Sequence, residues 1–248
     1  MSSPHAELRT TDIVVVPVER LELAFAPRPW PFATERRAEI DALFAALQRV
    51  NPTLWNGQVL MLHQYSIADG VFRGFYLETD FASLLAWRHW DFPDGQMRNC
   101  FAMAALRGSD DAFLLGVMAP HTANAGRIYF PAGLPDLSDV DGTQVDLARN
   151  VAREIREETG LYADDFVAQP GWTTVLAGPR IAQIKTFRAA ETAQTLRRRV
   201  LANLASQAQP EFRDIRIVNS PSDFDPMMPP FVTAFLMHVW KERSECTP

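Results

Sequence analysis

Three glutamates on one predicted helix are the residues of this chain that are best placed to do chemistry. Residues 146–161 read Asp-Leu-Ala-Arg-Asn-Val-Ala-Arg-Glu-Ile-Arg-Glu-Glu-Thr-Gly-Leu. Glu154, Glu157 and Glu158 are spaced i, i+3 and i+4, so on a helix their carboxylates project side by side. Carboxylates this close repel one another, and a hard divalent cation such as Mg²⁺, which takes oxygen ligands, compensates that repulsion. The segment therefore predicts a metal-binding helix.

The rest of this segment predicts where the helix begins, ends and packs. Asp146 suits an N-cap, and Gly160 suits the left-handed residue that ends many helices. A stripe of apolar residues is predicted to face the core, and it consists of Leu147 at its edge, Ala148, Val151, Ala152 and Ile155. An ordinary solvated surface helix is the alternative, but the glycine cap and the unpaired acidic face argue against it.

Residues 153–161 match, position for position, the Arg-Glu-(aliphatic)-x-Glu-Glu-x-Gly-(aliphatic) half of the Nudix box. The chain therefore resembles the Nudix hydrolases. This resemblance implies Mg²⁺- or Mn²⁺-dependent cleavage of the pyrophosphate in a nucleoside diphosphate linked to another group X, which gives a nucleoside monophosphate and X-phosphate. It also implies a metal site made by Glu154, Glu157 and Glu158, with the backbone carbonyl of Ala132 as a further ligand.

The resemblance further implies roles for residues around the metal. Arg153 is expected to hold the glutamates in place rather than to contact substrate. The general base is open, because in the family it is sometimes a box glutamate and sometimes a glutamate on a distant loop. Glu191 and Glu211 flank predicted elements in the C-terminal third, and both are candidates for the general base. The simpler interpretation is that both are solvated residues. The predicted catalytic set is Glu154, Glu157, Arg153 and Glu211.

The first half of the box departs from the family pattern. The family has a Glu eight positions before the Arg and a Gly six positions before that Glu, where this chain has Val145 and Asp139. Upstream, residues 129–133 read Tyr-Phe-Pro-Ala-Gly, which resembles the strand end and loop that open the family's motif. An insertion at 134–144 reconciles the two halves. The residues that can then stand in for the missing Glu are Asp136, Asp139, Asp141 and Asp146.

Composition and charge limit the class of protein to which this chain can belong. With 248 residues, 47% of them hydrophobic, the chain has material for one large domain or two small ones. The net charge of −6, without a basic tract, argues against a nucleic-acid partner. Cys100 and Cys246 are too few and too far apart for a disulfide framework. No signal core and no run of roughly 18 apolar residues is present, so we expect a cytoplasmic protein that does not enter a membrane.

Hydrophobic periodicity predicts a mixed α/β chain. The expected strands are 12–25 (as one strand or two), 59–65, 71–77, 99–106, 113–118, 127–130, 166–167, 173–176, 181–187 and 212–218. The expected helices are 33–50, 81–90, 146–161 and 192–208, and 229–240 fits either a helix or a short strand pair. A turn at 91–95 separates an N-terminal α+β extension (1–94) from a Nudix domain (95–248). The resemblance supplies the topology of that domain, an α/β/α sandwich with a mixed sheet.

A few residues outside the box bear on the substrate. The Leu-Trp-Asn-Gly run at 54–57 resembles part of the extension found in the Nudix branch that cleaves UDP-sugars, and 1–94 is therefore expected to help specify substrate. ADP-ribose, NADH, dinucleoside polyphosphates and coenzyme A remain open as substrates. Trp87 and Trp90 either stack on a nucleobase or, as is more common for tryptophan, pack in the core. Arg180 either reaches a phosphate or lies on the surface, and we expect the surface.

A second function class competes with the hydrolase. Val145 and the lengthened loop are also compatible with a catalytically inactive Nudix domain that acts as a nucleotide-binding or regulatory module. All three box glutamates are present, however, and an inactive domain has usually lost metal ligands, which favours the enzyme. The predicted partner is a small molecule of the nucleoside-diphosphate type, and a homodimer is common in the family.

Overall fold

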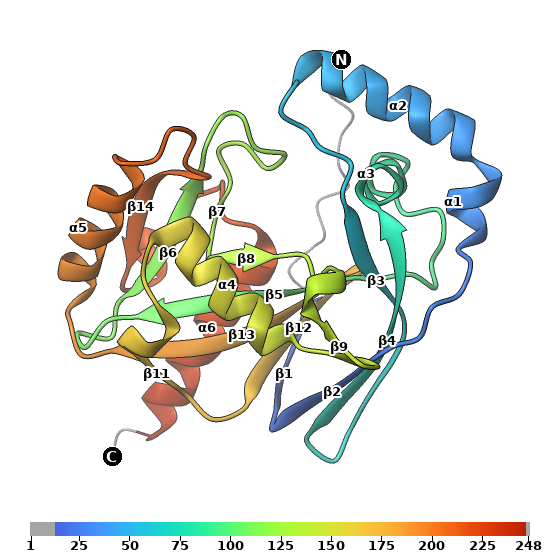
Figure 1. The fold of residues 1–248 in the computed structure, drawn as a ribbon. Helices are drawn as coiled ribbons and strands as arrows, with labels where there is room; N and C mark the ends of the chain where they lie inside the picture. Colours follow the sequence, from blue (N-terminus) through green and yellow to red (C-terminus); the bar gives the residue numbers. More distant parts are fainter. Residues whose placement is uncertain (1–12, 247–248) are drawn as a thin grey trace.

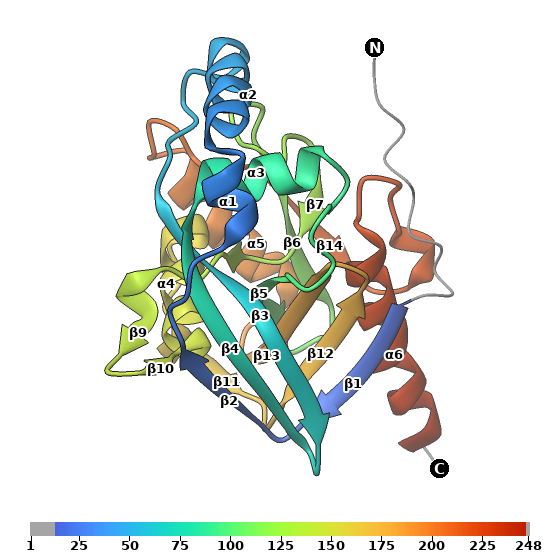
Figure 2. The same ribbon diagram turned by 90° about the vertical axis from the view of Figure 1, so that its right-hand side faces the viewer.

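The computed structural model describes residues 13–246, so Asp12, the predicted start of the first strand, and the ends of both predicted domains lie outside the described part. Two β-sheets and the helices that cover them make up this part (Figures 1 and 2). No helix in residues 13–246 is both long enough and apolar enough to cross a membrane.

The larger sheet is mixed. Its main path is β1 (Ile13–Val18), β12 (Trp172–Ala177), β13 (Arg180–Ala189), β5 (Asn99–Arg107), β6 (Phe113–Met118) and β14 (Phe212–Val218). Three short strands pair beside this path: β11 (Phe166–Ala168) with β13, β7 (Ile128–Tyr129) with β6, and β8 (Ala132–Gly133) with β5. The β13–β5 pair is parallel, and the other pairs are antiparallel.

Helices cover both faces of the larger sheet, because its central strands bury side chains in both directions. Along β5, Ala102 and Ala104 face a core that includes α4 (Leu147–Thr159) and α5 (Ala193–Leu204). Met103 and Ala105 face a second core, which includes α6 (Pro230–Cys246). Figure 1 shows α4 in front of this sheet and α6 behind it. The predicted fold class, a mixed sheet between helices, is confirmed.

The smaller sheet is also mixed and lies beside α4. Its order is β3 (Gln58–Ala68), β4 (Val71–Asp80), β2 (Arg20–Phe25), β10 (Gln144–Val145) and β9 (Val140–Asp141), with β2 parallel to β4. The helices of this side are α1 (Pro31–Glu35), α2 (Arg37–Val50) and α3 (Phe81–His89), and α2 packs on α3. Leu60, Leu62, Phe72 and Tyr76 join the core that contains α4, so the two sheets share buried residues.

One of the links between the two sheets along the chain is a single residue. β1 ends at Val18 and pairs with β12, whereas β2 begins at Arg20 and pairs with β4, so Glu19 alone separates strands of different sheets. The insertion makes a second connection, because its strand β10 pairs with β2 at Gln144 and Ala24. The predicted domain boundary at residue 94 stays a prediction, and these pairings connect residues on its two sides.

Several predicted elements take a more specific form in the structure. The helix predicted at 33–50 is divided at Arg36 into α1 and α2. Residues 229–240, for which a helix and a strand pair were both considered, lie largely in the helix α6. The strand predicted at 127–130 shortens to the two residues of β7. The insertion at 134–144 folds into a 3₁₀ turn (Leu137–Asp139) followed by the β9–β10 ribbon.

Candidate active site

The helix α4 begins and ends where the sequence predicts. The Asp146 side chain accepts hydrogen bonds from the backbone N–H groups of Ala148 and Arg149, both at 3.0 Å. Gly160 has φ of +70°, a conformation that costs glycine little and other residues more. Both ends of the helix that carries the glutamates are thus fixed by local interactions.

The buried face of α4 differs from the predicted apolar stripe. Ala148 is exposed and Ala152 is half-buried, whereas Asn150 and Glu158 are buried with Leu147, Val151 and Ile155. Both polar residues have partners in the preceding loop, because Asn150 Nδ2 donates to Asp139 Oδ2 at 2.9 Å and Glu158 Oε2 accepts from Ala132 N–H at 2.9 Å. The helix is therefore turned so that part of its acidic face lies against the chain that precedes it.

Arg153 is anchored by the insertion. Its Nη2 lies 2.9 Å from Oδ2 of Asp139, a side chain with no exposed surface, and its Nη1 lies 3.1 Å from Oε1 of Glu154. Of the four aspartates that can replace the missing Glu, Asp139 therefore makes the contact with the box arginine. The others differ: Asp136 caps the 3₁₀ turn and is 3.9 Å from Arg153, Asp141 is exposed, and Asp146 caps α4.

The box glutamates have different environments although they share one helix face. The side chain of Glu154 is 13% exposed, that of Glu157 is 52% exposed and Glu158 is buried. Burial raises the pKa of Glu154 to about 7, Arg153 opposes that rise, and Glu157 and Glu211 add to it. Burial also raises the pKa of Glu158 well above its ordinary value, and Glu154 and Glu211 raise it further. The group is thus short of positive charge.

The structure brings Glu211 to these glutamates and leaves Glu191 elsewhere. The pKa of Glu211 is raised first by its removal from solvent and then by Glu157, while His121 lowers it. Glu191 is paired with Arg199 near the start of α5. The four predicted catalytic residues therefore lie together, although Glu211 is fifty positions after Leu161, the last residue of the box.

Gly133 lies directly against the carboxylate of Glu154. A Cβ atom placed on Gly133 would be 2.1 Å from Glu154 Oε1 and 2.4 Å from its Cδ. Ala132, the predicted carbonyl ligand, precedes it in β8, and the Ala132 N–H is bonded to Glu158. The loop predicted to open the box thus contacts two of the glutamates.

The donor set suits a hard cation, but the side chains are not gathered as ligands. Within residues 13–246, no three carboxylate, imidazole or thiolate side chains are grouped as a metal site. Glu154 is turned to Arg153, and Glu158 is turned to the Ala132 N–H. The oxygen-only donors and the raised carboxylate pKa values fit Mg²⁺ or Mn²⁺, provided that these side chains leave their present partners.

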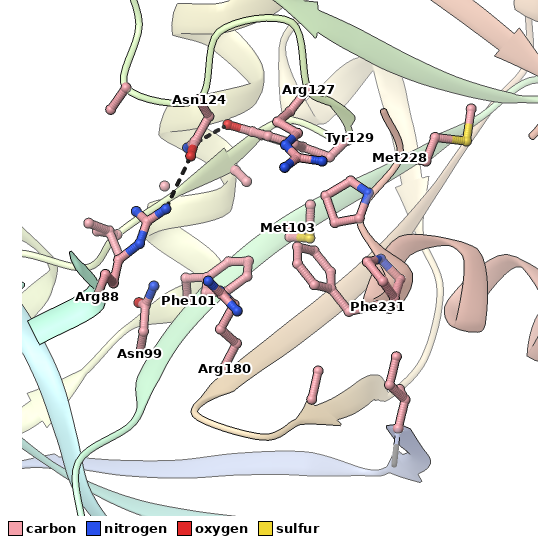
Figure 3. A pocket seen from close by; sticks show the side chains of 18 of the residues that line it. Arg88, Asn99, Phe101, Met103, Asn124, Arg127, Tyr129, Arg180, Met228 and Phe231 are labelled. Carbon is pink, nitrogen blue, oxygen red and sulfur yellow. Dashed lines mark hydrogen bonds between the residues drawn. The ribbon is translucent and has the colours of Figure 1, made fainter. Parts of the chain in front are cut away.

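A pocket of about 940 Å³ adjoins this cluster, since Ala132 and Gly133 form part of its wall. Figure 3 shows the guanidinium groups of Arg88, Arg127 and Arg180 pointing into it. Burial lowers the pKa of Arg180 to about 10, and Arg88 and Arg127 contribute to that lowering. The apolar and aromatic side chains of the wall include Phe81, Phe92, Phe101, Met103, Tyr129, Met228 and Phe231. The cavity therefore has a basic region of its own and adjoins the acidic cluster at Ala132 and Gly133.

Several expectations about substrate contacts change. Arg180 lines the pocket, so the expectation that it lies on the open surface is wrong. Trp87 is a fully buried core residue that donates to the Asp94 carbonyl. Trp90 is half-buried and packs against Phe32, with the Arg36 guanidinium over its ring. In the 54–57 run, the Asn56 side chain accepts from Ala82 N–H and donates to Asp80, the N-cap of α3.

The sequence did not single out Arg88, Arg127, Phe101 or Phe231. Arg88 and Arg127 lie in ordinary helical and loop contexts, and nothing in their spacing relates them to the box. In the sequence Phe101 and Phe231 look like ordinary core residues. Their rings do pack against each other edge to face, with centroids 5.7 Å apart. These residues are found only once the sheet pairings place their elements around one cavity.

Comparisons with known proteins add likenesses at low identity. No family model matches the chain, and no curated protein matches it. The chain is similar to the solved structure of a Nudix hydrolase from M. smegmatis, RenU (15% identity, 60% of this chain and 86% of that chain, TM-score 0.39). It is also similar to a MutT protein from Methanosarcina mazei (18% identity, 59% and 95%, TM-score 0.40).

A third likeness is to a bifunctional NMN adenylyltransferase/ADP-ribose pyrophosphatase from Francisella tularensis, solved with AMP and a manganese ion. The identity is 14%, the TM-score is 0.41, and the match covers 64% of this chain and 46% of that one. The function proposed below rests on the residues of this chain.

Proposed function

We propose that this protein is a divalent-metal-dependent hydrolase that cleaves the pyrophosphate of a nucleoside diphosphate linked to another moiety. The products are a nucleoside monophosphate and X-phosphate. One observation supports this proposal above all: Glu154, Glu157, Glu158 and Glu211 lie close together, with too little positive charge, beside a pocket large enough for a nucleotide, whose wall includes their neighbours Ala132 and Gly133.

In this proposal Glu154, Glu157 and Glu158 hold Mg²⁺ or Mn²⁺ with the carbonyl oxygen of Ala132. The bound metal neutralises phosphate charge and lowers the pKa of a bound water. The other parts of the site are supplied by the chain itself. Arg153, fixed at 2.9 Å by the buried Asp139, orients Glu154 at 3.1 Å. Glu211 is the group proposed to accept the proton of the attacking water, because it faces the box from a separate element.

We also propose that residues 1–94 select the substrate. Five residues of this part line the pocket, namely Ile13, Phe81, Arg88, Asp91 and Phe92, and the rest of the wall comes from 95–248. Nucleotide sugars belong to the substrates to be tested, because of the resemblance at residues 54–57. Mg²⁺ as the metal, a cytoplasmic location and a homodimer stay predictions.

A nucleotide-binding module without catalysis is the second candidate. The observation that favours it is the position of the glutamates, since Glu154 contacts Arg153 and Glu158 contacts the Ala132 N–H, and neither is directed to a shared centre. Such a module would bind nucleotides in the same pocket and release no product.

The two candidates are distinguished by turnover. Release of nucleoside monophosphate is measured with Mg²⁺ or Mn²⁺ across nucleotide sugars, ADP-ribose, NADH and dinucleoside polyphosphates. We expect turnover of at least one class, lost in Glu157→Gln, whose exposed side chain can change without disturbing the core. Glu35→Gln, an exposed glutamate at the end of α1, is the matched control and should behave as wild type. Tight nucleotide binding without turnover on any class would favour the binding module.

A further inference from the structure

Three arginines converge on the pocket from separate segments. Arg88 comes from α3, Arg127 from the residue before β7, and Arg180 from the first residue of β13. In Figure 3 the guanidinium group of Arg180 lies near Asn99 and Phe101, that of Arg88 near Asn124 and that of Arg127 near Tyr129, around the same pocket. The chain as a whole carries a net charge of −6, so this gathering of positive charge is local. A cavity wall with this composition attracts anions.

The three guanidinium groups are not neutralised by the described part of the chain. Arg88 donates to the amide oxygen of Asn124 at 3.4 Å, and Arg180 lies 5.0 Å from the centroid of the Phe92 ring. The wall also contains Asp91, but within residues 13–246 no carboxylate lies within 4.0 Å of these arginines. Burial and the two neighbouring arginines lower the pKa of Arg180 to about 10. An anion in the pocket would relieve this repulsion.

The arginines are separate from the site proposed to hold the metal. Arg153, and not Arg88, Arg127 or Arg180, pairs with the box glutamates in the described structure. The pocket reaches the glutamates at Ala132 and Gly133, so a ligand can extend from one region to the other. Such a ligand must carry one anionic group at the glutamates, through metal, and another at the arginines.

We propose that Arg88, Arg127 and Arg180 bind a phosphoryl group of the substrate other than the pyrophosphate that is cleaved. The preferred substrates are then nucleoside diphosphate derivatives that carry an additional phosphate monoester. That these substrates are cleaved rests on the proposed function, whereas the binding of their extra phosphate by the arginines does not. The guanidinium fork matches phosphate oxygens geometrically, and three such groups can surround one phosphate. Phe101, Phe231 and Met228 supply the apolar wall for the rest of the ligand.

The first test compares substrates that differ by one phosphate. NADPH is paired with NADH, and coenzyme A with dephospho-coenzyme A, and kcat/KM is measured for each with Mg²⁺. We expect the member with the extra phosphate to be preferred by about ten-fold or more, as charge-assisted hydrogen bonds to a phosphate allow. Equal kcat/KM values within the pairs that are cleaved would overturn the inference.

The second test assigns that preference to the arginines. The preference is the ratio of kcat/KM with and without the extra phosphate. Arg180→Gln and the exposed Arg127→Gln should each lower this ratio by about ten-fold, to a value near one, because each removes a charged partner of the phosphate. Arg180→Lys should retain part of it. Arg49→Gln, on the outer side of α2, is the matched control and should keep the wild-type preference. Arg127→Gln keeps the test decisive if Arg180→Gln does not fold. An unchanged preference in both glutamine variants contradicts the inference.

A binding measurement separates this inference from the hydrolase. Adenosine 3′,5′-bisphosphate and AMP, which contain no pyrophosphate, are titrated by calorimetry in EDTA into wild type and Arg180→Gln. We expect tighter binding of the bisphosphate in wild type and no such difference in the variant. That result without turnover of any substrate would support the arginine site and refute the hydrolase. Turnover with equal binding of both probes would refute the arginine site and leave the hydrolase.

Discussion

Gly133 is the residue whose size the candidate site restricts most. It lies in β8, next to the proposed carbonyl ligand, and its Cα faces the Glu154 carboxylate so closely that there is no room for a methyl group. Its φ is not in the left-handed region, so space and not backbone conformation requires the glycine. The position of Glu154 therefore depends on a residue without a side chain.

Gly133→Ala should disable the site without unfolding the protein. The added Cβ would occupy the space of the Glu154 carboxylate, so this side chain would be pushed away from β8, where it is proposed to hold the metal. We expect kcat/KM to fall about ten- to hundred-fold, as for other small displacements of catalytic groups. Gly95→Ala is the control, because a Cβ there meets nothing within 4 Å. Full activity in Gly133→Ala would show that Glu154 need not stay where the structure places it.

Cys100 is a second residue whose surroundings fix its chemistry. It is fully buried in β5, and burial raises the pKa of its thiol to about 12. A thiol that binds its proton more tightly in the folded state stabilises the fold fully below its unfolded pKa of about 8.5, and this stabilisation is lost as the pH rises from there toward 12.

The stability of wild type should therefore fall more steeply at alkaline pH than that of Cys100→Ala. The free energy of unfolding is measured in urea at pH 7.5, 9 and 10. The extra loss in wild type should approach about 1.4 kcal/mol per pH unit above the unfolded thiol pKa. The alanine variant starts lower because it leaves a cavity, so the slopes and not the absolute values are compared. Parallel slopes would mean that the Cys100 thiolate is tolerated in the fold.

Among the elements, the insertion at 134–144 supplies the buried aspartate that contacts Arg153. Asp139, at the end of its 3₁₀ turn, has no exposed surface and accepts from Arg153, Asn150 and the Asp136 N–H. The ribbon that follows is held on the other side by β2. The insertion therefore positions the box arginine and connects it to the smaller sheet.

Asp139→Asn should lower both stability and activity. The three donors all reach Oδ2, so an asparagine oxygen can still accept from them, but Arg153 loses its buried counter-charge. We expect a loss of about 1–3 kcal/mol in the free energy of unfolding, since a buried charged hydrogen-bond partner is removed. Asp141→Asn, an exposed position two residues on, should stay within about 0.5 kcal/mol of wild type. Equal losses of unfolding free energy in the two variants, measured by urea unfolding, would show that Asp139 does not position Arg153.

The elements show what the sequence was able to predict. Local signals were sufficient for α4, because Asp146 and Gly160 cap it through contacts within a few residues. They were sufficient for β6, a continuous apolar run that is buried throughout, and for β14, in which apolar and polar residues are mixed. They failed for the face of α4 at Ala148, since Asn150 and Glu158 are buried by partners in a loop whose fold no local pattern reveals. Arg88, Arg127 and Arg180 were not grouped for the same reason, because they meet only through the sheet topology.

At the scale of the whole molecule, the two predicted parts of the chain contribute strands to the same sheets and residues to the same core. β1 pairs with β12, and β2 pairs with β10, across the proposed boundary at residue 94. Leu60, Leu62 and Tyr76 from the first part are buried with Val151 and Ile155 of α4. The folding of the second part therefore depends on apolar contacts that the first part supplies.

The fragment 95–248 should not fold cooperatively by itself, whereas the full chain should unfold in one transition. Removal of the first part leaves one edge of β12 without β1 and exposes the α4 core. Coincident urea curves from far-UV and near-UV circular dichroism are expected for the full chain, and a weak near-UV signal is expected for the fragment. A fragment with its own sharp near-UV transition would show that the shared core is dispensable.

The single residue Glu19 between β1 and β2 has a consequence for ligand capture. A tether this short leaves no slack for the sheets to swing apart, and the cavity draws its walls from both, with Ile13 of β1 on one side and Phe81 after β4 on the other. The segments that carry the arginines and the glutamates thus keep their spacing before any nucleotide arrives. Binding then needs little of its free energy to close the protein, and a ligand of the wrong length is refused rather than accommodated.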